Sequence, residues 1–316
     1  MKKILKISGI IIGLFLLFIL SFGGYSAWKF ENMPPLPVRP LAIKAVNDSS
    51  LIAHGQTITT AICAYCHMGE DGTLSGKIFA SKEEGFGEIW SANITHKTLD
   101  NYSDGELAYT IRRGITREGR YIGPFMEHTL MSDEDITAII SFLRSDHPIN
   151  RYSEFTPPPA DWSFLAKVLI AGVGIFKPTP DGVKPWPHPD PADPVSHGRY
   201  LANVRLGCGG CHSAGFDTND LVNPEKSVNF FGGGNPVHKN EHSDVVYSAN
   251  ITMHPEDGIG KWTEEQFRVA VTGGLRPDNK PLDPAMPRFN FLSDEETHAL
   301  WSYLKTVPVL EDSPEK

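Results

Sequence analysis

The sequence predicts an all-α protein, in which one N-terminal membrane helix is followed by two similar helical domains in tandem. Three observations predict this fold: a long uncharged apolar run near the N-terminus, a Cys-x-x-Cys-His motif that occurs twice, and further short motifs that recur in one order around both copies. A chain of 316 residues also has the length of about two domains. We find no alternating apolar and polar run long enough to predict a sheet.

The apolar run extends from Ile7 to Trp28, and its 22 uncharged residues exceed the roughly 20 that cross a bilayer as a helix. Lysines precede the run, so the positive-inside rule keeps the N-terminus in the cytoplasm and exports the remaining chain. The alternative is a signal peptide with a cleavage site at Tyr25-Ser26-Ala27, although the run is longer than the usual core of about 7–15 residues. We therefore expect residues 1–30 to be a retained, single-pass anchor in the cell (inner) membrane, with the rest periplasmic.

The composition excludes one class of partner. The chain has 29 Lys and Arg against 38 Asp and Glu, a formal net charge of −9. A surface of this sign is a poor match for nucleic acid or anionic lipid, so we expect no nucleic-acid partner.

The four cysteines of the chain all belong to the repeated motif. Cys63-Ala64-Tyr65-Cys66-His67 and Cys208-Gly209-Gly210-Cys211-His212 have the spacing at which c-type heme is attached. Each thiol can add across one vinyl group of the porphyrin, and the adjacent histidine can then ligate the iron. A single motif is also compatible with a redox disulfide or part of a zinc site. Two copies that use every cysteine favour two covalently bound heme c groups, with His67 and His212 as the proximal ligands.

Four further motifs indicate a duplicated domain. Their order is the same in both copies, and the separation between equivalent residues drifts only from 145 at the first cysteine to 161 at the last motif, as loop insertions would produce. The pairs are His54-Gly55 and His197-Gly198, Ser91-Ala92-Asn93-Ile94-Thr95 and Ser248-Ala249-Asn250-Ile251-Thr252, Pro124-Phe125-Met126 and Pro284-Ala285-Met286, and Ser132-Asp133-Glu134 and Ser293-Asp294-Glu295.

The repeat and the Pro-rich stretches set the expected boundaries. We expect a Pro-rich tether at 31–50, a first domain at 51–147, a Pro-rich linker at 148–195 and a second domain at 196–310. The linker encloses one apolar segment, residues 162–176, that is too short to span a bilayer. It is either a helix packed across the two domains or a segment lying on the membrane or on a partner subunit.

Helices are expected at equivalent places in both domains. Residues 51–62 and 197–207 should carry the heme motifs, and capping boxes at Ser103-x-x-Glu106 and Thr263-x-x-Gln266 predict helices at 104–113 and 263–272. The last helix of each domain should bury one face, formed by Ile136, Ile139, Ile140 and Leu143 in the first and by Ala299, Leu300, Tyr303 and Leu304 in the second.

The sixth ligand of each iron decides the chemistry, because a methionine thioether closes the coordination sphere and makes the heme an electron carrier. Met126 and Met286 recur within the Pro-x-Met motif, on a loop before the last helix. We therefore predict that Met126 completes the site of His67 and that Met286 completes the site of His212.

Other methionines are weaker candidates. Met68 follows the proximal histidine directly and cannot reach the opposite face of the same iron, and Met131 aligns with Leu292. Met253, after the second Ser-Ala-Asn-Ile-Thr, is the other candidate in the second domain.

Several polar residues near the motifs have two interpretations each. His96 and His128 have no histidine counterpart in the second domain, and isolated histidines are usually solvated or structural. His54 and His197 do recur, but each precedes its motif on the same helix, where capping or hydrogen bonding is expected. The paired asparagines either hydrogen-bond a heme propionate or shape a turn (Asn93 and Asn250), and Trp262 packs either on the second heme or in the core.

The second domain resembles a known family. It contains in order Ser-Ala-Asn-Ile-Thr, Gly258-Ile259-Gly260-Lys261-Trp262-Thr263-Glu264-Glu265, Pro284-Ala285-Met286-Pro287 and Leu292-Ser293-Asp294-Glu295-Glu296. This order is similar to that in the cytochrome c domains of membrane-bound alcohol and aldehyde dehydrogenase cytochrome subunits, and of related membrane-anchored diheme cytochromes c. The resemblance covers nearly all of residues 50–150 and 195–307, and it implies a class I cytochrome c fold with a His/Met iron in each domain.

The chain departs from that family at three points. It has two Cys-x-x-Cys-His motifs where the dehydrogenase subunits usually carry three, which bears on the identity of a dehydrogenase partner. The first domain has Asn101-Tyr102-Ser103-Asp104-Gly105 in place of the Gly-x-x-Trp stretch, and Glu127 follows Met126 where the family commonly has proline.

The expected function is that of an electron carrier with no catalytic residue of its own. Its donor would be a dehydrogenase or quinol-oxidising complex, and its acceptor a terminal oxidase or soluble carrier. A rival interpretation is a diheme enzyme, such as a peroxidase or a thiosulfate-oxidising cytochrome, with one substrate-accessible heme and His128 near it. A third is a structural electron-input subunit bound permanently inside an oxidase or dehydrogenase.

Overall fold

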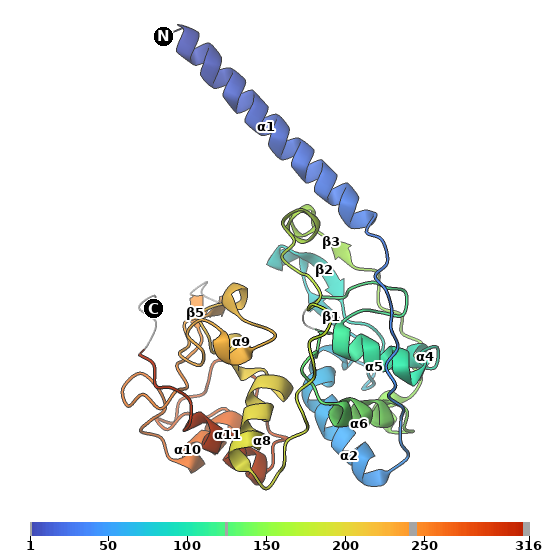
Figure 1. Ribbon diagram of the computed structural model, residues 1–316, viewed down its shortest axis with the longest axis vertical. Helices are drawn as coiled ribbons and strands as arrows, with labels where there is room; N and C mark the ends of the chain where they lie inside the picture. Colours follow the sequence, from blue (N-terminus) through green and yellow to red (C-terminus); the bar gives the residue numbers. More distant parts are fainter. Residues whose placement is uncertain (1, 124–125, 240–244, 312–316) are drawn as a thin grey trace. The chain divides into compact units, whose positions relative to one another are not determined.

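The computed structural model describes residues 2–123, 126–239 and 245–311 (Figure 1). Its α-helices are α1 (Lys2–Glu31), α2 (Ser49–Ile58), α3 (Ala64–His67), α4 (His96–Leu99), α5 (Asp104–Arg113), α6 (Asp133–Leu143), α7 (Phe164–Lys167), α8 (Pro194–Tyr200), α9 (Cys208–Cys211), α10 (Glu264–Gly273) and α11 (Asp294–Leu304). Its π-helical turns are η1 (Thr59–Cys63), η5 (Val168–Val173) and η6 (Leu201–Arg205), and its 3-10 turns include η2 (Lys82–Glu84), η4 (Pro148–Asn150), η7 (Phe216–Thr218) and η8 (Pro224–Lys226). Its strands are β1 (Ile78–Ala80), β2 (Gly87–Trp90), β3 (Asp161–Trp162), β4 (Pro236–Lys239) and β5 (Val245–Tyr247).

The chain divides into two compact units. Unit 1 contains Met1–Ala45, Cys63–Glu127 and Ile140–Pro178, and unit 2 contains Val46–Ile62, His128–Ile139 and Thr179–Lys316. Unit 2 thus takes in residues 51–62 and 128–139, which the sequence analysis assigns to the first domain. Each unit nevertheless contains one complete set of the predicted heme residues.

The local helix predictions are confirmed. Helix α5 begins at a reciprocal capping box of Ser103 and Glu106, and α10 begins at one of Thr263 and Gln266. The expected faces of α6 and α11 are buried, with no member more than 4% exposed. The helix that leads into each heme motif changes to a π-helical turn at the equivalent place, α2 into η1 and α8 into η6. Such π turns are frequent at functional sites.

The His-Gly motif of the second copy marks a close helix crossing within unit 2. A Cβ atom at Gly198 of α8 would collide with the backbone carbonyl of Ala299 in α11. Glycine is therefore needed here for its lack of a side chain rather than for its backbone freedom, since Gly198 lies inside a helix. Beside this crossing lies the core of unit 2, which includes Leu201, Phe231 and Trp301.

The expectation of a purely helical chain is too simple, because the described residues include two small sheets. Strand β2 pairs antiparallel with both β1 and β3, and β4 pairs antiparallel with β5. These strands contain two to four residues. Runs this short do not show the alternation over about 4–8 residues that identifies a strand in a sequence.

The Pro-rich segment after α1 lies against unit 1. The Leu36 N–H donates to the Gly119 carbonyl at 2.8 Å, and the Leu41 N–H donates to the Gly105 carbonyl at 3.0 Å. The segment is therefore held along α5 and the loop that follows it.

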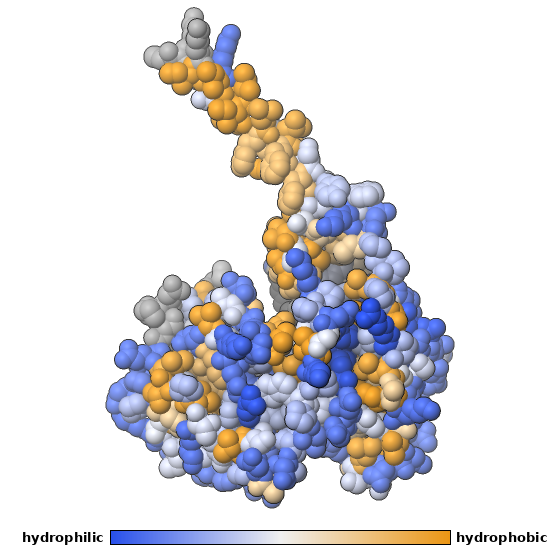
Figure 2. All heavy atoms as spheres, in the orientation of Figure 1, coloured by the Kyte–Doolittle hydropathy of each residue, from blue (hydrophilic) through white to orange (hydrophobic). Residues whose placement is uncertain are grey.

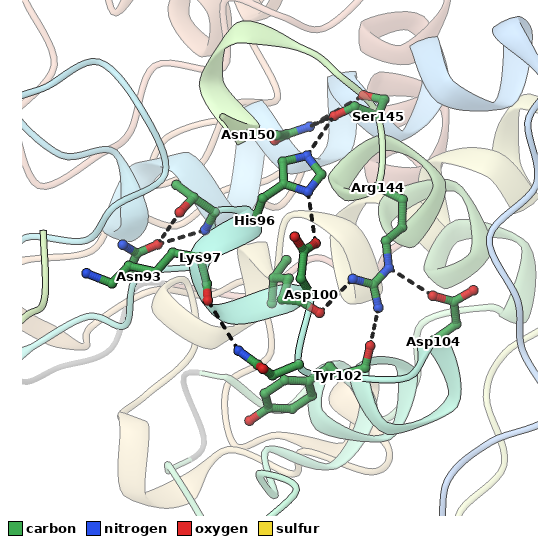
Figure 3. Close-up of polar contacts among 12 residues, drawn as sticks. Asn93, His96, Lys97, Asp100, Tyr102, Asp104, Arg144, Ser145 and Asn150 are labelled. Carbon is green, nitrogen blue, oxygen red and sulfur yellow. Dashed lines mark hydrogen bonds and ion pairs between the residues drawn. The ribbon is translucent and has the colours of Figure 1, made fainter. Parts of the chain in front are cut away.

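Helices α4 and α5 are joined in unit 1 by a polar network around Arg144, which follows α6 (Figure 3). The Arg144 Nε donates to Asp104 Oδ1 at 2.9 Å, and its Nη1 donates to the Leu99 carbonyl at 2.6 Å. A third bond from Nη2 reaches the Tyr102 carbonyl. The guanidinium thus satisfies backbone carbonyls at the end of α4 while pairing with a carboxylate at the start of α5.

Candidate functional site

Each heme motif lies on a single helical turn. Cys63 ends η1 and immediately precedes α3, which contains Cys66 and His67. Residues three and four apart on a helix share one face, so both thiols and the imidazole project to the same side. In the second motif, Gly207 adopts a left-handed conformation (φ 64°) that starts α9, and His212 follows that helix directly. The four cysteines are free thiols.

Both proximal histidines make the same hydrogen bond. Nδ1 of His67 donates to the Ala92 carbonyl at 2.7 Å, and Nδ1 of His212 donates to the Ala249 carbonyl at 2.7 Å. This bond fixes the ring orientation and leaves Nε2 as the nitrogen for an iron ligand. Ala92 and Ala249 are the second residues of the two Ser-Ala-Asn-Ile-Thr motifs, so one repeated motif orients the key residue of another.

Both imidazoles are buried, with 3% of His67 and 9% of His212 exposed. Burial lowers the pKa of each ring, and the hydrogen bond to the carbonyl offsets this only in part. The neutral imidazole, which is the form that ligates a metal, is therefore favoured at physiological pH.

The two paired asparagines shape turns, which decides between their two interpretations. Asn93 Oδ1 accepts hydrogen bonds from the Thr95 N–H at 2.9 Å and the Thr95 hydroxyl at 2.6 Å, and Asn250 and Thr252 repeat this arrangement at 2.8 and 2.7 Å. Each amide nitrogen donates to a backbone carbonyl elsewhere in its own unit. Both side chains are buried and bonded at both ends, so they hold the Ala-Asn turn against the histidine instead of facing a propionate.

Two glycines complete this arrangement, and the sequence analysis missed them. The Gly76 N–H donates to the His67 carbonyl at 2.9 Å, and the Gly233 N–H donates to the His212 carbonyl at 3.1 Å. Both have positive φ, 93° and 71°, and a Cβ atom on either would collide with backbone of the adjacent Ser-Ala-Asn-Ile-Thr turn. Their separation of 157 residues equals that of the two Ser-Ala-Asn-Ile-Thr motifs, and this shared offset is the sequence signal that could have identified them.

The donor chemistry of these residues fits covalently bound heme c. Burial, with a smaller contribution from Cys66, raises the pKa of the Cys63 thiol to about 12, and burial with Cys211 does the same for Cys208. The thiols are therefore protonated at neutral pH, and an S–H group adds across a vinyl C=C bond to give a thioether. Within the part of the chain that the structure describes, no group of three or more His, Cys, Asp or Glu could hold a metal ion, so the zinc interpretation finds no further ligands there.

The backbone N–H groups of the two predicted methionine ligands make equivalent hydrogen bonds. The Met126 N–H donates to the Gly123 carbonyl at 3.3 Å, and the Met286 N–H donates to the Asp283 carbonyl at 3.0 Å. Both methionines follow a helix that ends at a left-handed glycine, α5 at Gly114 and α10 at Gly274. Both methionines are half-buried, and each belongs to the same unit as its predicted histidine. Pro124 and Phe125 of the first Pro-x-Met motif lie outside the described residues.

The structure gives His96 another role. Its Nδ1 pairs with Asp100 at 3.1 Å and its Nε2 with the Ser145 carbonyl at 3.2 Å, so both ring nitrogens are engaged at the start of α4 (Figure 3). His128 is half-buried in unit 2, and its carbonyl accepts the Met131 N–H at 3.0 Å.

The weaker methionine candidates are also placed. Met68 directly follows α3 as its C-terminal cap, and Met131 is a core residue with 1% of its surface exposed. Met253 and Trp262 are partly buried and pack against the core of unit 2.

Unit 2 contains a buried ionic network that the sequence analysis did not anticipate. Asp135 is fully buried and accepts hydrogen bonds from His54 Nε2 at 2.8 Å and from the Tyr200 hydroxyl at 2.8 Å. Arg205 pairs with the same carboxylate at 3.3 Å and with Glu296 at 2.8 Å. His54 is thus a hydrogen-bonding residue, one of the two roles expected for it.

The charge state of Asp135 follows from these contacts. Burial raises the pKa of the carboxyl, but the hydrogen bond from His54, the Arg205 charge and the Tyr200 hydroxyl outweigh it and lower the pKa to about 2. The network borders an open cavity of about 610 Å³, also lined by His188 and His197.

Comparison with known proteins agrees with this geometry. The cytochrome c family model matches residues 52–146, which form a cytochrome c domain and imply covalently bound heme c. The chain is 27% identical over 296 residues to the fructose dehydrogenase cytochrome subunit of Gluconobacter japonicus, covering 89% of this chain and 57% of that protein. It is 25% identical over 281 residues to the cytochrome c subunit of the alcohol dehydrogenase (quinone) of Gluconacetobacter polyoxogenes, covering 83% of this chain and 57% of that protein.

A shorter relative is covered more fully. The chain is 25% identical over 263 residues to a diheme cytochrome c-type protein of Cereibacter sphaeroides, covering 79% of this chain and 83% of that protein. By contrast, the chain spans 57% of the length of each of the two dehydrogenase subunits.

Proposed function

We propose that this chain, whose residues 52–146 are a cytochrome c domain, is a membrane-anchored diheme cytochrome c that relays single electrons. The observation that carries the proposal is the repeated contact between the proximal imidazole and an alanine carbonyl, 2.7 Å in both units. Because the second unit repeats the contact, the same attachment chemistry is proposed for residues outside the matched domain.

In each unit, two cysteines are assigned to heme attachment and a histidine and a methionine to iron ligation. In unit 1, Cys63 and Cys66 would form the thioethers to heme c, and His67 and Met126 would ligate its iron. Cys208, Cys211, His212 and Met286 have these roles in unit 2. Heme c supplies one-electron chemistry by cycling its iron between the ferric and ferrous states. The protein contributes ring orientation, water exclusion by burial, and a thioether that favours the ferrous state.

The location and partners follow from the anchor and the relatives. Helix α1 includes a stretch, Lys6–Glu31, that is long and apolar enough to cross a membrane. We propose a single crossing with both heme units on the periplasmic side. The relatives named as dehydrogenase cytochrome subunits support a dehydrogenase as the electron donor, with a quinol-oxidising complex as the other candidate. The acceptor would be a terminal oxidase or a soluble carrier, and no substrate is transformed on this chain.

A spectroelectrochemical titration of the purified full chain tests this function. We expect two hemes per chain, two one-electron transitions, and the loss of one transition when Cys208 and Cys211 are both replaced by alanine. The matched variant, Cys63→Ala with Cys66→Ala, should remove the other transition. A chain with one heme, or with no reversible transition, would contradict the proposal.

A further inference from the structure

The apolar segment of the linker folds against the end of α1. Helix α7 and the turn η5 form one helical segment, Phe164–Val173, which begins at the N-cap Ser163 and ends at Gly174 in a left-handed conformation (φ 79°). In Figure 1 it is the short helix beside β3, close to the C-terminal end of α1. Both elements belong to unit 1.

Small residues allow the two helices to approach closely. A Cβ atom at Gly23 of α1 would lie 2.8 Å from the ring of Phe164, and one at Gly172 would collide with the Ser26 hydroxyl. Ser26, Ala166 and Ala171 are no more than 5% exposed. Close packing through glycine, serine and alanine is the usual way in which helices associate in membranes, where lipid gives apolar side chains no reason to cluster.

Polar groups at this contact pair with one another. Lys167 Nζ pairs with Glu31 at 2.6 Å, and Lys29 Nζ donates to the Ala171 carbonyl at 2.9 Å. The rings of Phe30 and Trp162 meet in an edge-to-face arrangement, with centroids 5.8 Å apart. Lys29 and Lys167 are thus each tied to a group on the other helix.

Four large apolar side chains of residues 164–175 are exposed. Phe164 is 62% exposed, Leu165 59%, Val173 60% and Ile175 42%. Figure 2 shows the apolar surface of α1 and further apolar side chains next to its C-terminal end. Exposed apolar groups gathered in this way mark an interaction surface.

The position along α1 identifies what covers the surface. Helix α1 has 30 residues, which corresponds to about 45 Å, whereas the hydrocarbon core of a bilayer is about 30 Å thick. The residues of α1 that touch the segment run from Phe22 to Glu31, the outer end of the helix. This end also carries Tyr25 stacked on Trp28, a pair typical of the membrane–water interface. The segment therefore lies at the depth of the headgroups.

We propose that Phe164–Ile175 lies in the outer headgroup region of the bilayer, with Phe164, Leu165, Val173 and Ile175 inserted among the acyl chains. The helical part has ten residues, which is too short to cross and suits a helix in the plane of the interface. This inference rests on the proposed anchoring by α1. Apolar burial drives the insertion, so binding requires no anionic lipid and agrees with the acidic composition of the chain.

Labelling by lipid tests the inference on the full chain. The protein is reconstituted in phosphatidylcholine nanodiscs that contain a phosphatidylcholine with a photoactivated carbene precursor on its acyl chain, and labelled peptides are identified by mass spectrometry. We expect label in α1 and in 164–175. Phe216 and Leu221 of unit 2 are the controls, because they are 58% and 57% exposed and lie far from the segment in the sequence.

The outcomes separate this inference from the anchor. Label in α1 but not above control level in 164–175 would overturn the inference and leave the anchor intact, as expected if a protein subunit covers the segment. Absence of label from α1 would overturn the anchor and the inference with it. In the double variant Leu165→Gln, Val173→Gln, label in 164–175 should fall several-fold while label in α1 is unchanged. The matched double variant Phe216→Gln, Leu221→Gln should change neither.

Discussion

The backbone N–H of Gly76 donates to the carbonyl of His67, and the space that a side chain on Gly76 would need is taken by the Ser91 carbonyl. The glycine therefore joins the turn that bears the proximal histidine to the turn that orients it. Gly233 has the same relationship to His212 in unit 2.

Substitution of Gly76 should damage the first heme site. Gly76→Ala places a Cβ against backbone at φ 93°, whereas Gly72→Ala has a similar φ of 72° but meets nothing within 4 Å. Both variants pay the cost of a left-handed conformation, about 1–2 kcal/mol. Only Gly76→Ala adds an overpacking cost of about 1–3 kcal/mol and shifts the potential of one heme. Denaturant unfolding and redox titration measure the two effects, and equal losses in the two variants would show that the contact is unimportant.

The methionine ligands are tested by truncation. Met126→Ala and Met286→Ala should each lower the potential of one heme by on the order of 0.1 V, within the roughly 0.8 V that axial ligands can span, because a thioether favours ferrous iron. Met68→Ala and Met253→Ala are the matched controls in units 1 and 2 and should leave both potentials in place. If the spectrum and potentials of Met126→Ala or Met286→Ala equal those of the wild type, that residue is not a ligand.

Carbon monoxide distinguishes an electron carrier from a diheme enzyme. Two irons closed by histidine and methionine should leave the ferrous wild-type spectrum almost unchanged under the gas. Removal of one thioether in Met286→Ala should permit one molecule of carbon monoxide to bind per chain. Stoichiometric binding to the wild type would instead indicate an open heme and favour the enzyme interpretation.

Asp135 should make the stability of unit 2 depend on pH. Because its folded pKa, about 2, lies below its ordinary value of 3.8, the ionised carboxylate stabilises the fold above that ordinary value. This stability, about 2 kcal/mol, is lost as the pH falls toward the folded pKa. Asp135→Asn should flatten the loss between about pH 4 and pH 2 and cost about 3–5 kcal/mol at neutral pH, since Arg205 is left buried without this partner.

The control for that experiment is Glu134→Gln, which changes an exposed neighbour on the same helix. It should retain the wild-type pH dependence of the free energy of unfolding. An Asp135→Asn protein that loses stability on acidification as steeply as the wild type would contradict the proposed role of the network.

Glycine at position 172 should be needed for the helical segment Phe164–Val173 to pack against α1. Gly172→Ala pushes a methyl group toward the buried Ser26 hydroxyl and to within 2.9 Å of the Phe22 ring, whereas a Cβ at Gly24 meets nothing within 4 Å. We expect amide hydrogen exchange in 164–173 to accelerate in Gly172→Ala by about fivefold or more, corresponding to a loss of about 1 kcal/mol of local stability. Gly24→Ala should leave that exchange unchanged, and equal exchange in both variants would exclude close packing at this point.

Local chemistry is what the sequence revealed best. The capping boxes at Ser103 and Thr263 and the buried face of α6 depend on residues within one or two helical turns. Contacts made by backbone groups that are far away in the sequence were not predicted. The carbonyls of Ala92 and Ala249 have no side-chain signature, although each orients a histidine 25 or 37 residues away.

The side-chain partners of Asp135 could not be predicted from the sequence either. In the sequence it is indistinguishable from the acidic residues that are common at the surface in the first turn of a helix. Its partners Tyr200 and Arg205 lie 65 and 70 residues further along the chain, so no periodicity connects them. The heme ligation by Met126 and Met286, and the domain limits expected from the repeat, stay predictions.

If Phe164–Ile175 lies in the bilayer surface as proposed, its contact with α1 would restrict how unit 1 can move. A domain on a single membrane helix is free to tilt and to rotate about the helix axis, and so samples many orientations. A second apolar segment in the plane of the bilayer would remove most of that freedom, because tilting would lift Phe164 and Val173 into water. Unit 1 would then meet membrane-bound donors in one preset orientation, and encounter would be limited by lateral diffusion in two dimensions rather than by rotational search.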